Sequence, residues 1–264
     1  MPDPQPPSRK RGVVAIFDLL GVRARWREEG GDPLRLASEI RDFARLVAEA
    51  FKEDSLYKGE ITLMDPEYVA IDWSTWALSD TVLLTGMYDL EPDSRMMNQI
   101  GNHLVETFYT AIDRGFLLRG ALSIGTYFQA DQVVVGPAID DVAYWYERAE
   151  WAGIMATPTM SELMERPEIR SDAELLFAKW NVSMKTGPPI ETWALWWPRE
   201  RQRASIDRIF TRAPMDESTA RKRTETIRFY NEMMNRMYPG FYDQETGLVR
   251  TRPSPPSPIR EEVR

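Results

Sequence analysis

Cysteine is absent from the 264 residues, and histidine occurs once, at His103. Disulfide bonds and thiolate metal sites are therefore excluded, and a zinc site built on histidines would lack its ligands. No apolar run approaches the roughly 18 residues that a membrane-spanning helix needs, and the opening MPDPQPPSRKR has no apolar segment typical of a secretion signal. We therefore expect a cytoplasmic protein with no membrane partner.

An excess of positive charge is also missing. The formal net charge is −8, which opposes a broad electrostatic attachment to nucleic acid, so no nucleic-acid partner is expected. A small anionic substrate could still be bound locally through metal ions. The hydrophobic fraction of 43% is sufficient for a full core. The length suits one large domain or one domain with an appendage.

Short apolar runs alternate with segments of helical periodicity along the chain. Strands are predicted at 12–18, as a hairpin within 68–86, at 116–128, 131–136 and 153–158, and helices at 33–51, 94–114 and from 137 onward. This order predicts an α+β or α/β sandwich in which helices cover one face of a mainly antiparallel sheet. The predicted organisation is a flexible N-terminus (1–11), a main domain ending in a late hairpin (12–198), a C-terminal helical extension (199–250) and a disordered tail (251–264).

Two aspartates lie at predicted strand ends. Asp18 closes the apolar run Val13–Phe17, and Asp80 lies at the reversal of the predicted hairpin. Two carboxylates brought close together repel unless one holds a proton or a cation lies between them. Magnesium or manganese bound by one or two carboxylates fills its other positions with water and substrate phosphates. The pattern therefore fits a metal site for nucleotides, but it also fits Asp18 capping the turn at Leu19–Gly21 and Asp80 as an ordinary turn residue.

Four segments carry a resemblance to a known family. The class III nucleotidyl cyclase domain has Phe-x-Asp-x-x-Gly, then Gly-Asp at a hairpin, a strand Arg followed by a Gly-containing strand end, and Gly-x-x-Val-Asn before a helix. The corresponding segments here are FDLLG (17–21), LSDTVLL (78–84), RGALSIGTY (119–127) and VVVGPAIDDVAYWYERAEWAGIMATP (133–158). The chain resembles this domain over residues 12–158. Within the class it is most similar to the pyrimidine cyclases of bacterial Pycsar antiphage systems.

The resemblance implies a ferredoxin-like sheet with packed helices and a site that binds two Mn²⁺ or Mg²⁺ ions. By position, Asp18 and Asp80 become metal ligands and catalytic residues, and the carbonyl of Leu19 joins them. Arg148 and Arg119 are candidates for stabilising the transition state. The backbone amides at Leu20–Val22, at the start of a helix, suit a triphosphate. The predicted substrate-binding residues are Phe17, Leu20, Gly21, Val22, Tyr57, Trp76, Val133, Asp140 and Tyr144.

Several positions depart from the purine cyclases. Trp76 stands where those enzymes have a base-reading Lys, and Val133 stands where they have an Asp or Cys. Asp140 and Tyr144 correspond to their Asn and Arg pair. Because these groups for reading a purine edge are missing, a smaller base held by an aromatic contact, from Tyr57 or Trp76, is expected.

The function implied by the resemblance is a phosphorus–oxygen lyase that converts UTP to 3′,5′-cyclic UMP and pyrophosphate by a two-metal mechanism. Class III sites form between two protomers, so a homodimer with composite sites is expected. The product would be a second messenger for antiphage defence, read by a separate effector. Three alternatives stay open: a cytidylate cyclase making cyclic CMP, a nucleotide-binding regulator without catalysis, and a relative of palm-type polymerases or diguanylate cyclases.

Other conspicuous residues are predicted to be structural. His103 lies in the middle of a predicted helix and has no partner histidine, so packing or exposure is favoured over catalysis. Tryptophans are expected in the core or an interface, because aromatic residues dominate the energetics of both. These tryptophans are Trp145, Trp151, Trp193, Trp196 and Trp197. The methionines Met233, Met234 and Met237 are predicted to fill apolar space in a helix or interface.

Overall fold

The computed structural model describes residues 8–22, 25, 32–56, 71–88, 91–130, 133–212 and 215–249. Its strands are β1 (Ser8–Leu20), β2 (Asp72–Leu78), β3 (Thr81–Met87), β4 (Leu117–Ala130), β5 (Val133–Val135), β6 (Gly153–Ala156), β7 (Phe177–Val182), β8 (Ile190–Leu195), β9 (Tyr242–Asp243) and β10 (Leu248–Val249). Its helices are α2 (Pro33–Leu56), α4 (Ser94–Asp113), α5 (Pro137–Arg148), α6 (Pro158–Met164), α7 (Pro167–Leu176), α8 (Arg203–Phe210) and α9 (Glu217–Met237). The predicted α+β class is confirmed. Tyr57, one of the predicted substrate-binding residues, lies outside the described residues.

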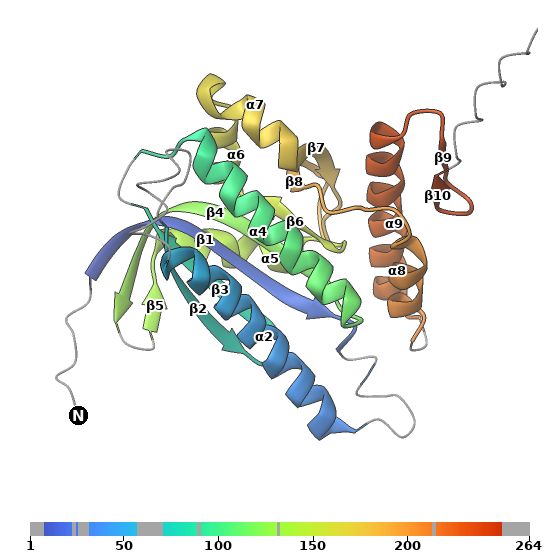
Figure 1. The fold of residues 1–264 in the computed structure, drawn as a ribbon, viewed down its shortest axis with the longest axis horizontal. Coiled ribbons are helices and arrows are strands. Elements are labelled where there is room, and N and C mark those ends of the chain that lie inside the picture. The colour runs from blue at the N-terminus through green and yellow to red at the C-terminus, as the bar shows by residue number, and fades with distance from the viewer. Residues whose placement is uncertain are drawn as a thin grey trace, which may run out of the picture.

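The main sheet has the strand order β2-β3-β1-β4-β6-β8-β7, with β5 paired to β4 (Figure 1). It is mixed, because β4 and β6 run parallel while the other paired strands run antiparallel. Strand β1 lies between β3 and β4 and pairs with both. Residues Val13–Phe17 are at most 7% exposed. A central strand covered on both faces needs such a continuous apolar run.

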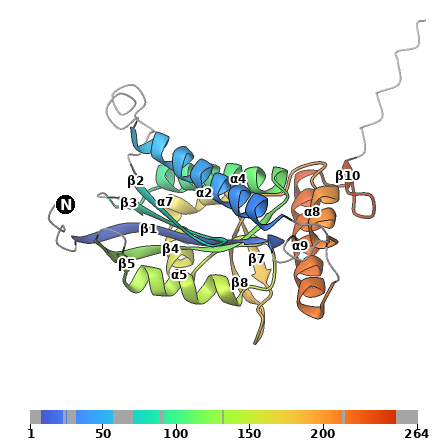
Figure 2. The same ribbon diagram turned by 90° about the horizontal axis from the view of Figure 1, so that it is seen from below.

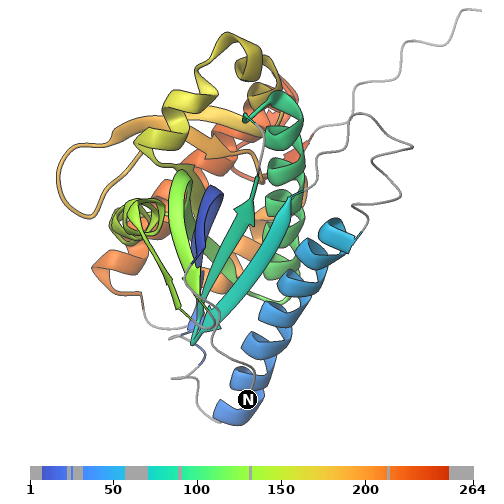
Figure 3. The same ribbon diagram turned by 90° about the vertical axis from the view of Figure 1, so that its left-hand side faces the viewer.

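Helices cover both faces of the sheet, which corrects the prediction that they cover one. Helices α2 and α4 lie on one side, and α5 lies on the other (Figures 2 and 3). Two parallel strands cannot be joined by a tight turn, so the connection from β4 to the parallel strand β6 must cross over one face of the sheet. Helix α5 lies within that connection and packs on β4 and β1.

Helix α4 forms the centre of the layer that covers the other face. Asp93 caps its N-terminus, and the Asp93 carboxylate accepts a hydrogen bond of 3.0 Å from the backbone N–H of Met96. The predicted apolar stripe is buried: Met97, Ile100, Leu104, Phe108 and Ile112. On α4, the ring of His103 lies 5.1 Å from the ring of Phe51 on α2. The histidine is therefore packed, as its position in the sequence predicted.

Two short helices, α6 and α7, follow β6 where the sequence predicted neither. The late hairpin, which the sequence predicted over 172–198, begins later, because residues 172–176 belong to α7 and the hairpin consists of β7 and β8. Pro158 and Pro167 each occupy the first turn of one of these helices. Proline is tolerated there, since the N–H that it lacks would have no partner within the helix.

The C-terminal helices pack against the main domain rather than apart from it (Figure 1). Phe229 on α9 contacts the rings of Trp151, Trp180 and Trp197. Five tryptophans were predicted to pack: Trp151, Trp193 and Trp197 are at most 1% exposed, and Trp145 and Trp196 are partly buried. The domain boundary at residue 198 stays a prediction.

Two further expectations are corrected by the structure. Strand β1 begins at Ser8, so residues 8–11 are not a flexible terminus. These residues pair with Thr126–Gln129 of β4, and backbone pairing requires no apolar side chains. Met237 is 42% exposed at the end of α9, whereas Met233 and Met234 are buried as predicted. No helix in the described part of the chain is both long and apolar enough to cross a membrane.

Candidate active site

The site is built around Asp18, near the C-terminal end of β1. Asp18 is paired in register with Thr81 on β3 and with Arg119 on β4. Because side chains alternate along a strand, Asp18 lies on the same face as Ile16 and on the opposite face from Phe17. The buried run before Asp18 therefore fixes the carboxylate in the middle of the sheet, on the face that carries α5.

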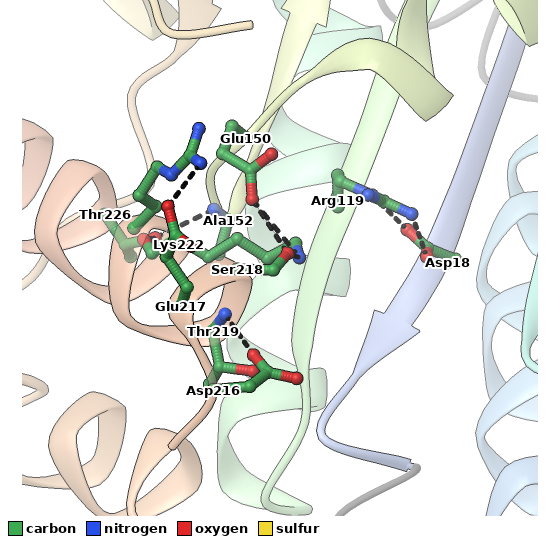
Figure 4. A network of polar contacts seen from close by, with 11 residues as sticks. Asp18, Arg119, Glu150, Ala152, Asp216, Glu217, Ser218, Thr219, Lys222 and Thr226 are labelled. Atoms are coloured by element: carbon green, nitrogen blue, oxygen red, sulfur yellow. Dashed lines mark hydrogen bonds and ion pairs between the residues drawn. The ribbon is translucent and has the colours of Figure 1, made fainter. Parts of the chain in front are cut away.

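Arg119 holds the Asp18 carboxylate at two points. The guanidinium donates from Nε to Oδ1 at 3.1 Å and from Nη2 to Oδ2 at 2.7 Å (Figure 4). The two side chains are only 11% and 15% exposed. Such a two-point ion pair is strong and fixes the relative orientation of both groups. The structure therefore shows Arg119 as the direct partner of Asp18, a contact that the sequence did not predict.

Asp80 lies in the two-residue turn between β2 and β3. The residue before it, Ser79, has a φ of 57°, a left-handed conformation that such tight turns use. The backbone N–H of Leu19 donates to the carbonyl of Asp80 at 2.9 Å, which ties the turn to the end of β1. Asp18 and Asp80 are thus brought together as predicted. Their roles as ligands and catalytic residues stay a prediction.

Burial dominates the electrostatics of Asp18. Burial raises the pKa of the Asp18 carboxyl above its ordinary value, Arg119 opposes this rise, and the charge of Asp80 adds to it. The two carboxylates carry two negative charges, and the guanidinium supplies one positive charge. A cation bound between the two carboxylates would reduce their mutual repulsion.

The oxygen donors of this site fit magnesium or manganese. Two carboxylates and the nearby carbonyl of Leu19 are hard oxygen ligands, which these ions prefer. Each carboxylate oxygen has two lone-pair positions, so the bonds from Arg119 do not use all of the capacity of Asp18. Within the described residues there is no group of three or more His, Asp or Glu side chains that could hold a metal. Such a site depends on phosphate oxygens to complete its coordination.

Phe17 is fully buried, so its side chain cannot contact a substrate from its place in the core. The alternation that exposes Asp18 to one face turns Phe17 to the other. Val22 is also buried, at 5% exposure. A helical turn begins beyond β1, where the N–H of Arg25 donates to the carbonyl of Gly21 at 3.2 Å. The proposed contribution of the amides at Leu20–Val22 needs only backbone atoms and stays a prediction.

Trp76 lies on the same face of the sheet as Asp18. It pairs with Leu83 on β3, and Leu83 pairs with Ile16 on β1. Ile16 lies two residues before Asp18 on β1, so Trp76 points to the same face of the sheet as Asp18. Trp76 is partly buried. The structure thus places Trp76 on the same face of the sheet as Asp18 but two strands away, on β2, and its contact with a base stays a prediction.

Three of the predicted site residues lie on one face of helix α5, and a fourth lies on β5. Asp140, Tyr144 and Arg148 share the spacing of one helical face, and all three are exposed. The Arg148 guanidinium lies 3.9 Å from the centre of the Tyr144 ring, so the two form a cation–π pair. Val133 on β5 is 58% exposed. Asp140, Tyr144 and Arg148 therefore share the face of α5 that the sheet does not cover.

Two residues missed by the sequence reasoning lie near Asp18 and Arg119. Tyr146 on α5 interacts with both of their charges; burial and the neighbouring carboxylates raise the pKa of its phenol. Burial and the charges of Arg119 and Lys222 lower the pKa of Lys185. Among the described residues, none forms an ion pair with Lys185. The signal in the sequence was that Lys185 is the one basic residue in the turn Ser183–Pro189.

Comparisons with known proteins identify the fold. No protein-family model matches the sequence, and no curated protein matches it either. The structure is similar to the adenylyl cyclase CyaB from Pseudomonas aeruginosa, with a TM-score of 0.51 and 8% identity over 72% of this chain and 96% of that one. Adenylate cyclases from Trypanosoma brucei give a TM-score of 0.45 and 10% identity over 70% of this chain and 89% of theirs. The similarity to CyaB confirms the predicted class III cyclase-like fold.

Proposed function

We propose that this protein is a pyrimidine nucleotide cyclase, which converts UTP to 3′,5′-cyclic UMP and pyrophosphate. The observation that carries the proposal is the arrangement of Asp18, which lies between Arg119 and the turn that holds Asp80. This arrangement occurs in a fold shared with an adenylyl cyclase. In the reaction the ribose 3′-oxygen forms a bond to the α-phosphorus, and the bond from that phosphorus to the leaving pyrophosphate oxygen breaks.

Asp18, Asp80 and the carbonyl of Leu19 would hold the two Mg²⁺ or Mn²⁺ ions. Bound ions of this kind lower the pKa of the attacking hydroxyl and neutralise the charge of the leaving pyrophosphate. The rigid position of Asp18 supports this role, because its carboxylate is fixed by the central strand and by Arg119. The two carboxylates bind and orient; the phosphates of the nucleotide complete the coordination.

Positive charge beside the two carboxylates supports phosphate binding. Arg119 contacts Asp18 directly, and Lys185 interacts with the charges of Arg119 and Asp18. We propose that Arg119 and Lys185 orient the triphosphate, with the amides at Leu20–Val22 as further donors. The exposed pair of Tyr144 and Arg148 would stabilise the transition state.

A homodimer would complete the site. Arg148 and Tyr144 point away from the sheet of their own protomer, so they are available to a second protomer. Large apolar side chains are also exposed on β4, β5 and α5: Phe128, Val133, Val135 and Tyr144. Burial of these side chains between two copies would be favourable. We therefore propose composite sites shared by two protomers, as the resemblance implies.

The proposed preference for a pyrimidine rests on Val133 and Trp76, which stand at the base-reading positions of the purine cyclases. Val133, paired with Ala130 at the far end of β4 from Arg119, offers no hydrogen-bonding group. Trp76 offers an aromatic surface on the face of the sheet that carries Asp18. This surface suits stacking of a small base better than reading of a purine edge. A role in antiphage defence in the cytoplasm, with a separate effector for the cyclic nucleotide, is proposed from the family resemblance alone.

The test is incubation with each of the four nucleoside triphosphates and Mn²⁺, with the products resolved by mass. We expect cyclic UMP as the main product. Asp80→Ala should abolish turnover, while the control Asp72→Ala, an exposed residue at the start of the same hairpin, should keep it. Cyclic AMP or cyclic GMP as the main product would refute the base assignment, and wild-type turnover by Asp80→Ala would refute the two-metal site.

A regulator without catalysis is the second candidate. Asp140 and Tyr144 replace the Asn and Arg of active purine cyclases, and Asp18 already binds Arg119 at both carboxylate oxygens. This alternative predicts binding of UTP with Mn²⁺ but no cyclic product. Isothermal titration calorimetry together with the product assay separates the two.

A further inference from the structure

Four side chains of α9 contact the segments next to the candidate site, one through a backbone N–H and three through side chains. We call these residues the α9 anchor: Ser218, Lys222, Glu225 and Thr226. The Thr226 hydroxyl accepts from the backbone N–H of Ala152 at 2.8 Å. The Glu225 carboxylate accepts from the Ser183 hydroxyl at 2.6 Å. The anchor thus contacts both the segment that follows α5 and the turn between β7 and β8.

The strongest part of the anchor involves a buried carboxylate. Glu150 is 5% exposed, and its Oε1 accepts from the Ser218 hydroxyl at 3.0 Å and lies 3.4 Å from the Lys222 ammonium nitrogen (Figure 4). The Lys222 side chain is itself only 16% exposed. A carboxylate so far from water needs a charged partner, and removing that partner is costly. Lys222 therefore determines how well the segment around Glu150 is held.

The backbone around Glu150 carries residues of the proposed substrate site. The N–H of Glu150 donates to the carbonyl of Ser183 at 2.8 Å, and the N–H of Lys185 donates to the carbonyl of Arg148 at 2.7 Å. These two bonds join the end of α5 to the β7–β8 turn. Glu150 lies two residues after Arg148 in the chain and is bonded to Ser183 of the turn that carries Lys185. A shift of Glu150 would therefore move both Arg148 and this turn.

Open space beside the anchor makes these positions dependent on it. A pocket of about 410 Å³ lies between α9 and the β7–β8 turn, and its walls include Glu150, Ser183, Met184 and Glu225. Tight packing on all sides would hold the turn without polar contacts, whereas a pocket leaves room for it to move. Phe229 of α9 also packs on Trp151 and Trp180, and beside the pocket the hydrogen bonds and the ion pair of the anchor add polar restraints to that packing.

We propose that the α9 anchor positions Arg148 and Lys185 for the nucleotide, with Glu150 and Lys222 as positioning residues. The inference rests on the proposed function, because Arg148 and Lys185 are placed in the site by that proposal. In this arrangement α9 determines where Lys185 lies beside Asp18 of its own protomer and where Arg148 lies toward the second protomer, while contacting no substrate.

The test compares Lys222→Met and Glu150→Gln with the control Arg236→Met in the full chain. Arg236 forms an exposed ion pair with Glu232 at 3.0 Å on the same helix, far along the chain from the anchor. The two anchor variants change the local charge in opposite directions, yet both break the ion pair of Glu150. We expect kcat/KM to fall about tenfold in both, an effect typical of coupled neighbours, and to change less than about twofold in Arg236→Met.

A double-mutant cycle separates positioning from a general loss of structure. Because Lys222 acts through Arg148 and Lys185, Lys222→Met should have a smaller effect on kcat in the Arg148→Ala background, where only the contribution of Lys185 remains. Lys222→Arg, which keeps the charge, should retain most of the turnover. Opposite effects of Lys222→Met and Glu150→Gln would overturn the inference, because they would show that only the local charge matters. An equal effect of Lys222→Met with and without Arg148 would overturn it as well.

Amide hydrogen exchange tests the anchor without any turnover. In Lys222→Met the amides at 148–152 and 183–185 should exchange faster than in the wild type, while those of β1 should not change. Unchanged exchange at both segments would refute the positioning even if activity fell. If the wild type forms no cyclic nucleotide, the proposed function fails, and the exchange result still decides whether the anchor fixes this backbone.

Discussion

Replacement of Arg119 by methionine removes the partner of Asp18 while keeping much of the apolar stem. The Asp18 side chain is 15% exposed, and both of its oxygens accept from Arg119. Breaking a buried ion pair by removing one partner costs about 3–5 kcal/mol, because the remaining charge is left uncompensated. For a protein with a free energy of unfolding of about 5–15 kcal/mol, this is a large loss.

The loss should depend on pH in a defined direction. Burial already raises the pKa of Asp18 above its unfolded value of 3.8, and Arg119 opposes that rise. Between the unfolded and folded pKa values the folded state binds more protons, so the free energy of unfolding falls as pH rises through that window. Without Arg119 the folded pKa rises further and the window extends upward. The deficit of Arg119→Met relative to the wild type should therefore shrink as the pH is lowered from 7 toward 4.

Urea unfolding of both proteins in EDTA, at several pH values between 4 and 7, measures this deficit. EDTA keeps metal ions from replacing the missing charge. The control is Asp18→Asn/Arg119→Met, in which the buried carboxylate is also removed; it should recover more than half of the stability lost at pH 7. A loss below about 1 kcal/mol, as for a surface pair, or a deficit that grows on acidification, would show that the Asp18 charge is not buried as described.

Two further predictions concern the packing that holds the site. In Gly120→Ala the new Cβ would lie 2.6 Å from the carbonyl oxygen of Ile16 and 2.8 Å from Cβ of Phe17, so β4 must move away from β1. We expect about 1–3 kcal/mol of destabilisation in urea unfolding, and an unchanged midpoint would contradict the close approach. Trp197 is fully buried and stacks on Phe108 at 4.3 Å. Trp197→Ala should cost about 3–5 kcal/mol, clearly more than Trp196→Ala at the partly buried neighbour; equal losses would refute this.

Much of the fold follows from local patterns. The run Val13–Phe17 predicted a buried strand, and helical periodicity predicted α4 and the apolar face of α5. The turn residues before Thr81 predicted the β2–β3 hairpin. Helices α6 and α7 were not predicted, because each is short and amphipathic periodicity needs more turns to stand out. Their position depends on packing, mainly of α7 on α4 and of α6 on β4, rather than on a strong local signal.

The candidate site likewise has residues that the sequence predicted and contacts that only the structure shows. Asp18 and Asp80 could be singled out from the sequence, since strand ends and turns are marked locally. The partnership of Asp18 with Arg119 could not, because the two residues are 101 positions apart and meet only through the register of β1 and β4. Lys185 was overlooked for the same reason, because Arg119 and Lys222, whose charges lower its pKa, are distant from it in sequence.

The sequence by itself determined which residue types stand at strand ends and which segments are apolar enough to be central, because alternation and periodicity act over a few residues. Only the tertiary structure decided what surrounds those residues. Phe17 points into the core, whereas Asp18 lies on the face of the sheet that α5 covers. Lys222 of the C-terminal helix lies against the buried Glu150. Charge compensation of this kind depends on distances between chain segments, which only the register of the sheet and the packing of the helices set.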